Sequence, residues 1–179
     1  MKVLKDTFCG KTWRGSLIRI LILLTLCTVP FWYHYRLTYV DGISMEPTYD
    51  DGQWTLMQRS RSFDKDWVPD RFDAVVVWDE KRKVRLCKRV IGLPGEKIQI
   101  IEGRIFIDGT LLSDSFGNGY MVFRKFIEPG TKQTWWKEYE NIPPIVIVSD
   151  HVWVVGDNRE DSVFGHFPIK DIIGKVVLY

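Results

Sequence analysis

A lysine stands at position 88, in a segment with the alternating pattern of a half-buried β-strand. In residues 84–91 (VRLCKRVI), the period of two places Lys88 on one face with Val84, Leu86 and Val90, and places Arg85, Cys87 and Arg89 on the opposite face. Burying an unpaired ammonium group is costly, so its pKa falls and the neutral amine can act as a base near pH 7. The pattern leaves a second interpretation open, in which the strand is an edge or the lysine reaches water with only its stem covered.

The nucleophile that such a base could serve is Ser44, within residues 42–48 (GISMEPT). A turn permitted by Gly42 and a second one stiffened by Pro47 hold the serine at a fixed bend, which exposes its hydroxyl and its own N–H together. Serine in such a loop is also an ordinary turn residue. None of the three histidines has a partner at a spacing that suggests a Ser-His-Asp triad, so Lys88 is the candidate base.

The cysteines and histidines indicate no metal site and no disulfide. Cys9 precedes the apolar segment near the N-terminus, Cys27 lies inside it and Cys87 follows it, so no two of them share the outer side where a disulfide would form. No Cys/His pair has ligand spacing. We therefore expect no metal and no cofactor.

Residues 17–33 are almost wholly apolar, which predicts a membrane-spanning helix. A spanning helix needs roughly 20 residues, and Arg19 can extend this one by reaching toward the interface, while Trp32 and Tyr33 suit the far interface. A cleavable signal peptide needs small residues at the cut, and residues 30–35 offer none. We predict an uncleaved anchor; the alternative, a buried core helix, would need cover on all faces.

Charge is divided unequally between the tail and the body. Residues 1–33 carry five basic side chains and one acidic one, which leaves twenty basic and twenty-two acidic side chains for the remainder. The basic tail predicts a cytoplasmic N-terminus, with the body on the outer side of the membrane. The slightly acidic body argues against nucleic-acid binding.

After the anchor the chain reads as short β runs separated by turns, with little helical period. The predicted strands are 54–57, 74–78, 85–91, 97–101, 104–107, 145–148, 152–155 and 175–178, and Glu102-Gly103 predicts a hairpin. Residues 111–144 break this rhythm and are interpreted as an inserted lobe or long loop, whose Trp135-Trp136 pair belongs to the core of the lobe or to a membrane-facing patch. The sequence predicts a tail and anchor at 1–35 and an all-β domain at 36–179.

Three segments together resemble a known family. Residues 42–48 (GISMEPT), 88–96 (KRVIGLPGE) and 156–162 (GDNREDS) are similar, in order and spacing, to the successive motifs of type I signal peptidases, the Ser/Lys leader peptidases of family S26. The preceding anchor matches as well, and the likeness covers roughly residues 17–179. It implies an all-β catalytic domain in which Ser44 is the nucleophile, Lys88 is the general base, and the substrate lies as an added strand beside the segments leading to both.

The resemblance also implies roles around this dyad. Gly42 stands where some relatives have a serine that donates to the oxyanion, so the oxyanion hole is expected to use the Ser44 N–H and other donors. Ser162 matches the serine that orients the lysine amine, although a turn-capping hydroxyl is the alternative. Structural roles near the site are expected for Met45, Pro47, Arg89, Gly156, Asp157, Asn158 and Arg159.

The third motif departs from the family pattern, because no second arginine follows Ser162. We expect Asp157 and Arg159 to hold the turn through a partly buried ion pair. The carboxylate that replaces the missing pairing is left open among Asp157, Glu160 and Asp161.

The function implied by the resemblance is the removal of N-terminal signal peptides from exported preproteins, with cleavage after small residues (Ala-x-Ala type) at the outer side of the bacterial inner (cytoplasmic) membrane. The short body and the shortened third motif slightly favour a specialised member, such as one that matures a pilin subunit in a conjugation system. Two other classes compete with this interpretation. Self-cleaving repressors share a Ser/Lys dyad but predict an N-terminal helix-turn-helix, and a non-catalytic anchored β protein predicts that Ser44 and Lys88 are dispensable.

Overall fold

The computed structural model describes residues 13–126 and 135–178, and the chain divides into two compact units, Met1–Arg36 and Leu37–Tyr179. The first unit holds helix α2 (Trp13–His34), which begins four residues before the predicted span. Within the described residues it is the one helix long and apolar enough to cross a membrane. Gly15 is its one buried residue, so the helix lacks the cover that a core helix needs.

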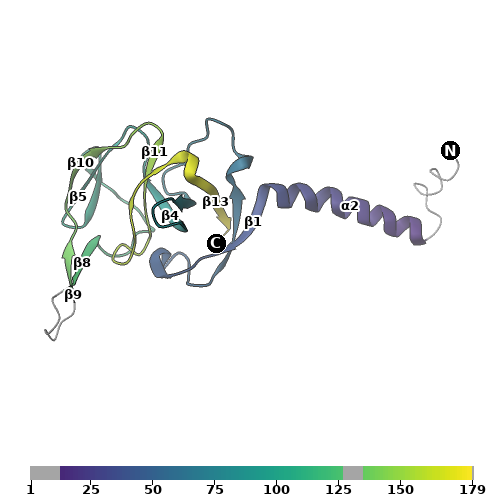
Figure 1. The fold of residues 1–179 in the computed structure, drawn as a ribbon, viewed down its shortest axis with the longest axis horizontal. Coiled ribbons are helices and arrows are strands. Elements are labelled where there is room, and N and C mark those ends of the chain that lie inside the picture. Colours follow the sequence, from purple (N-terminus) through teal and green to yellow (C-terminus); the bar gives the residue numbers. More distant parts are fainter. Residues whose placement is uncertain (1–12, 127–134, 179) are drawn as a thin grey trace. The chain divides into compact units, whose positions relative to one another are not determined.

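In the described residues the strands form three antiparallel sheets, which confirms the all-β prediction (Figure 1). The largest sheet has the order β1-β2-β13-β3-β4-β11-β12. Its strands are β1 (Tyr35–Tyr39), β2 (Trp54–Arg59), β3 (Ala74–Asp79), β4 (Val84–Gly92), β11 (His151–Val155), β12 (Gly165–Pro168) and β13 (Ile172–Leu178). A four-stranded sheet has the order β10-β5-β6-β7, with β5 (Lys97–Ile101), β6 (Arg104–Ile107), β7 (Thr110–Leu111) and β10 (Ile142–Val146).

Runs of β-branched residues explain why β3 lies inside the large sheet. Val75 and Val77 are buried in one apolar cluster, while Ala74 and Val76 are buried in another, on the opposite face. Fully burying a valine side chain contributes roughly 1.5–3 kcal/mol, so a strand apolar on both faces is most stable at the centre of a sheet. Residues 84–89 of β4 pair with the whole of β3, which fixes the position of β4 in the sheet.

The predicted strands are present, and one of them is shifted along the sequence. The strand predicted at 145–148 is shifted to Ile142–Val146, and it contains Pro143 and Pro144. Strand β10 is at the edge of its sheet, where a missing N–H costs no ladder bond. The hairpin predicted at Glu102-Gly103 is confirmed, since both residues have the positive φ, 47° and 74°, typical of a tight hairpin turn.

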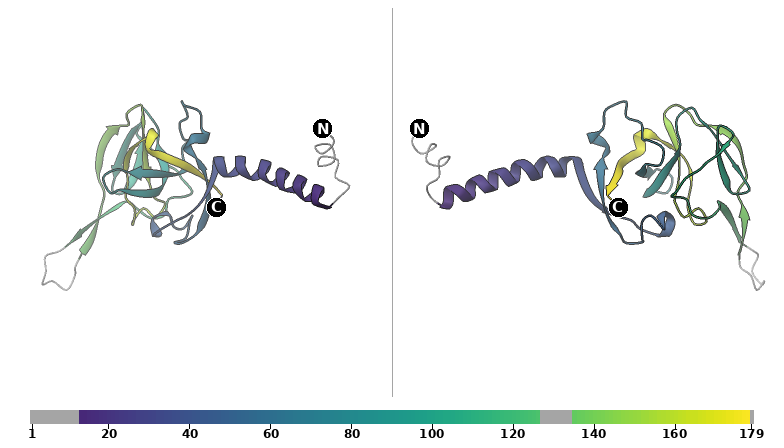
Figure 2. Two further views of the ribbon diagram at one scale, coloured as in Figure 1. Left: turned by 45° about the vertical axis from the view of Figure 1, so that its right-hand side comes forward. Right: turned by 180° about the vertical axis from the view of Figure 1, so that it is seen from behind.

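Residues 111–144 contain an irregular stretch followed by a third, two-stranded sheet. Its strands, β8 (Val122–Phe126) and β9 (Trp135–Tyr139), extend away from the two larger sheets in both views of Figure 2. The side chains of Trp135 and Trp136 lie outside the described part of the chain. The irregular stretch before β8 returns to the body and contacts the turn that follows β11.

Candidate active site

Ser44 lies in a single turn of 3₁₀ helix, Ile43–Met45, between β1 and β2. Gly42 precedes this turn with a φ of 89°, a conformation that favours glycine. The side chain of Met45 is fully buried in the core, and Pro47 follows after a cis peptide bond. The loop is therefore anchored immediately after the serine.

Lys88 lies in the interior of the large sheet, because β4 is flanked by β3 and β11. The residue is 3% exposed, so it neither occupies an edge strand nor reaches water. Its Nζ donates a hydrogen bond of 2.6 Å to Oγ of Ser44. Two residues that are 44 positions apart in the sequence thus meet as a nucleophile and a base would have to.

Burial lowers the pKa of Lys88 from 10.5 to about 8, because the ammonium loses its water, and the charges of Cys87 and Asp157 offset this only in part. Burial also raises the pKa of the Cys87 thiol to about 11. The thiol is therefore largely neutral at pH 7, and its charge supports the Lys88 ammonium only at higher pH. At a pKa of about 8, roughly a tenth of the amine is neutral at pH 7.

The turn 156–159 packs directly on the Ser44 loop. The Asn158 N–H donates to the carbonyl of Ser44 at 3.1 Å, and Nδ2 of Asn158 donates to the carbonyl of Ile43 at 3.2 Å. A Cβ placed on Gly156 would lie 2.0 Å from the carbonyl oxygen of Ser44. Close backbone approach, rather than an unusual φ, therefore requires glycine at this position.

The predicted ion pair between Asp157 and Arg159 is wrong. Asp157 pairs instead with Arg89, whose Nε and Nη2 donate to its two carboxylate oxygens at 2.7 and 2.5 Å. Both side chains are completely buried, and Nη1 of Arg89 also donates to the carbonyl of Phe72 at 2.7 Å. Asp157 was one of three carboxylates considered as a replacement for the missing pairing. It has a defined partner, and that partner, Arg89, belongs to the second motif.

The alternation predicted for β4 fails at both of its ends. Val84 is 42% exposed, although it was placed on the buried face, and Arg89 is buried, although it was placed on the polar face. The ring of Phe116 covers Arg89, with its centroid 3.7 Å from the guanidinium carbon. From Lys88 to Gly92 the strand is therefore buried on both faces, which the local pattern could not reveal.

Arg159 pairs with Asp114, a residue that the sequence analysis missed. Nη2 of Arg159 lies 2.9 Å from Oδ2 of Asp114, and the two side chains are 5% and 7% exposed. A buried arginine requires a carboxylate, and this requirement was the one available signal. It could not select Asp114 among 23 acidic residues, because the partner lies 45 positions away in an irregular stretch.

Gly42 and Ser162 make contacts other than those of oxyanion and amine support. The Gly42 N–H donates to Oδ1 of Asp51 at 2.7 Å and is occupied by that bond. Oγ of Ser162 accepts from the Gly156 N–H at 2.7 Å and donates to a backbone carbonyl at 2.9 Å, which is a turn-capping arrangement. In the described part of the chain, no hydrogen bond joins Ser162 to Lys88.

A narrow cavity of about 90 Å³ opens at Ser44 and Lys88. One side of its lining comes from residues 38–41, at the end of β1, and the other from residues 85–87 of β4, with Thr55 and Val76 between them. A water molecule occupies about 30 Å³ of liquid, so the cavity holds only a small group.

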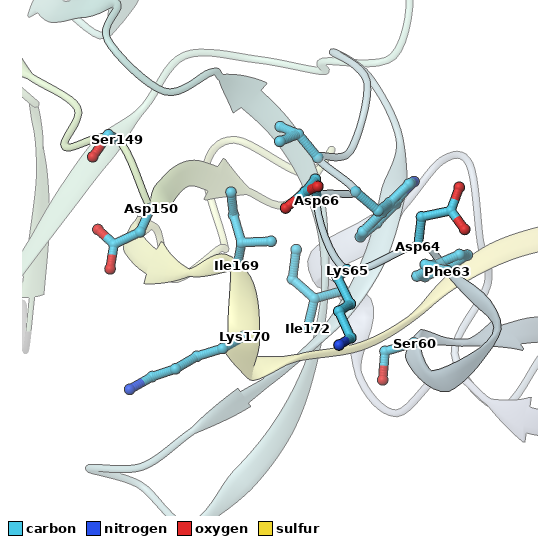
Figure 3. Close-up of a pocket in the computed structure, with 12 residues that line it drawn as sticks. Ser60, Phe63, Asp64, Lys65, Asp66, Ser149, Asp150, Ile169, Lys170 and Ile172 are labelled. Carbon is cyan, nitrogen blue, oxygen red and sulfur yellow. The ribbon is translucent and has the colours of Figure 1, made fainter.

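A larger hollow, of about 600 Å³, lies elsewhere on the body, between loop 60–68 and residues 149–150 (Figure 3). Its walls carry charges of both signs, including those of Lys65, Asp66 and Lys170. Neither Ser44 nor Lys88 lines it. Ser44 and Lys88 thus line the smaller of these two hollows.

The chain is similar to a family of known proteins and to several of its members. The family model described as "Signal peptidase, peptidase S26" matches residues 13–179. Signal peptidase I of Streptococcus pneumoniae (strain ATCC BAA-334 / TIGR4) is 28% identical over 192 residues, which covers 92% of this chain and 89% of that protein. Signal peptidase I V of Bacillus subtilis (strain 168) is 30% identical over 142 residues, which covers 76% of this chain and 80% of that protein.

Among solved structures, a signal peptidase I from Enterococcus faecalis V583 is similar with a TM-score of 0.41 and 21% sequence identity. The match covers 62% of this chain and 98% of that one.

Proposed function

Because the chain belongs to the signal peptidase family, peptidase S26, we propose that it removes N-terminal signal peptides from exported preproteins with a dyad of Ser44 and Lys88. Family membership makes it a serine peptidase. The observation that carries the proposed dyad is the 2.6 Å contact between Nζ of a buried lysine and Oγ of Ser44. A lysine with a lowered pKa next to a serine hydroxyl is the arrangement that an activated nucleophile needs.

Acylation begins when neutral Lys88 takes the hydroxyl proton of Ser44 as Oγ attacks the scissile carbonyl. The negative charge that develops on the carbonyl oxygen is stabilised by backbone donors, the Ser44 N–H among them. Lys88 then returns the proton to the leaving amine, the C–N bond breaks, and the signal peptide stays attached to Oγ as an ester. In deacylation Lys88 takes a proton from the water that attacks the ester, the bond between the carbonyl carbon and Oγ breaks, and Lys88 returns the proton to Oγ, which releases the signal peptide with a free carboxyl end and restores Ser44.

The substrate is proposed to lie extended between residues 38–41 and residues 85–87, as an added strand whose carbonyl reaches Ser44. The small volume of the cavity supports a preference for alanine-sized residues on the acyl side of the cut, of the Ala-x-Ala type. A bound peptide would remove further water from Lys88 and lower its pKa again. The base would then be more fully neutral when the substrate is present.

Helix α2 is proposed to anchor the enzyme in the inner (cytoplasmic) membrane, with the basic tail in the cytoplasm and the catalytic domain on the outer side. Its length and apolar composition support this assignment. The enzyme would meet its substrates where their own signal segments lie in the lipid. Anchor and substrate would then share one membrane surface.

The test compares Ser44→Ala and Lys88→Met with the unaltered chain in membranes that receive a secreted precursor. Both variants should accumulate in the membrane fraction and lose precursor cleavage by at least a thousandfold, because each lacks one half of the proposed dyad. Ser149→Ala and Lys170→Met are matched controls, since both residues line the other hollow (Figure 3). Retained cleavage in either dyad variant would contradict the proposed mechanism and favour a non-catalytic role for Ser44 and Lys88.

A further inference from the structure

The start of the insertion contacts the third motif through its backbone as well as its side chains. The Asn118 N–H donates to the carbonyl of Asp157 at 2.8 Å, and the Arg159 N–H donates to the carbonyl of Asn118 at 2.9 Å. These two bonds form a parallel bridge between Asn118 and Asn158. The backbone of Asn158 is thus held from one side by the insertion, while its own N–H and side chain hold the Ser44 loop on the other side.

A single carboxylate organises this stretch of the insertion. Oδ1 of Asp114 accepts hydrogen bonds from the backbone N–H groups of Phe116 and Gly117, and Oδ2 binds Nη2 of Arg159. Residues 114–117 are therefore closed into a turn that is tied to the third motif. The guanidinium of Arg159 lies against Gly117 so closely that a Cβ there would be 2.7 Å from its central carbon.

The same turn aims Phe116 at the guanidinium of Arg89. Arg89 in turn holds Asp157 with two hydrogen bonds, so the segment 114–118 contacts Arg89, Asp157 and Arg159 together. None of these residues lines the cavity at the dyad. Each of them belongs to the turn 156–159 or binds a residue of it, and the N–H of Asn158 in this turn donates to the carbonyl of Ser44.

We infer that Asp114 is a positioning residue for the reaction: through Arg159 and the turn 156–159, its carboxylate sets where the Ser44 loop lies relative to Lys88. This inference rests on the proposed function of the dyad. Buried ion pairs are poor sources of net stability, because desolvation offsets their attraction. A role in placing the nucleophile, where displacements of about 1 Å cost up to 100-fold in rate, accounts for a charged pair at this position.

The test measures cleavage of a peptide with an Ala-x-Ala site by the full-length enzyme carrying Asp114→Asn. Asparagine keeps an oxygen that can accept from the N–H groups of Phe116 and Gly117, but it removes the charge that holds Arg159. We expect kcat to fall at least tenfold while KM stays within twofold, since the cavity walls are untouched. Asp150→Asn, which alters an exposed carboxylate paired with His151, should leave both constants unchanged.

A double variant, Asp114→Asn with Arg159→Met, separates positioning from stability, because asparagine keeps the acceptor for the two N–H groups while both buried charges are removed. With both buried charges removed, the melting temperature should be close to that of the unaltered chain and above that of Asp114→Asn. The kcat should nevertheless stay low. Recovery of kcat together with the melting temperature would overturn the inference, as would an unchanged kcat in Asp114→Asn. If Ser44→Ala is inactive and Asp114→Asn fully active, this inference alone fails; an active Ser44→Ala removes the proposed dyad itself.

Discussion

At the scale of single residues, Lys88 works against the stability of the domain that contains it. Its pKa falls from 10.5 to about 8 because the folded state strips water from the ammonium. Between these two values the unfolded chain keeps a proton that the folded chain has released, so stability rises with pH across that window. Below about pH 8 the lysine is charged in both states, and the unfavourable contribution is present in full.

Replacing this residue should therefore stabilise the fold while abolishing activity. Lys88→Met at pH 7 should raise the free energy of unfolding by about 2 kcal/mol, the balance of about 3 for the buried charge and about 1 for the lost hydrogen bond to Ser44. Urea unfolding at pH 7 and pH 10 measures this change. The gain should shrink at pH 10, and a variant that is less stable than the unaltered chain at pH 7 would contradict the buried charge.

The same pKa determines how activity depends on pH. Below about pH 8, the neutral fraction of Lys88 falls roughly tenfold per pH unit, so kcat/KM should fall with the same slope from pH 7.5 to pH 5.5. Above about pH 8.5 the profile should level off. Peptide cleavage in a series of buffers gives the profile, and a rate independent of pH down to pH 5 would exclude a neutral amine as the base.

The sequence pointed to Ser44 and Lys88 as candidates because both carry local signals: a serine between two turn residues, and a lysine in an apolar alternation. It did not reveal Asp114, whose only distinguishing property is a partner 45 residues away. It also paired Asp157 with the nearest arginine along the chain, whereas the buried geometry selects Arg89, 68 positions away. Local patterns identify reactive groups more readily than the residues that hold them in place.

At the scale of elements, the third motif serves as a support for the nucleophile loop. In Gly156→Ala the new Cβ would lie 2.0 Å from the carbonyl oxygen of Ser44, so one of the two segments must move. This variant should therefore lower kcat at least 100-fold and destabilise the domain. Gly109→Ala is the control, since a Cβ there meets nothing within 4 Å even though its φ is 80°. Peptide cleavage and thermal unfolding should show a small loss of stability and full activity for the control, and equal kcat in the two variants would remove the support role.

The positions of strands were predictable where apolar runs are continuous. The predictions failed where a neighbouring element determines which residues of a strand are buried or tolerated. Strand β10 accepts two prolines because it lies at a sheet edge, a fact that its own sequence does not contain. Strand β4 buries an arginine because an aromatic ring from the insertion covers it. In both cases the environment of the strand outweighs the pattern within it.

At the scale of the whole molecule, the order of strands separates the two halves of the proposed dyad. Ser44 follows β1 and precedes β2, whereas Lys88 lies on β4, which pairs with β3. Strands β2 and β3 do not pair with each other, because β13 (Ile172–Leu178) lies between them and bonds to both. Val176 and Ile172 of β13 also complete the two apolar clusters that cover the faces of the large sheet.

We expect this placement to keep the proposed dyad unassembled while the chain is being synthesised. Until residues 172–178 have emerged, the half-sheet that carries the serine has no strand through which to join the half-sheet that carries the lysine. Such long-range pairings form late and slowly in folding, after the loops between them have closed. We therefore expect proteolytic competence to arrive with β13, after helix α2, Ser44 and Lys88 have been made.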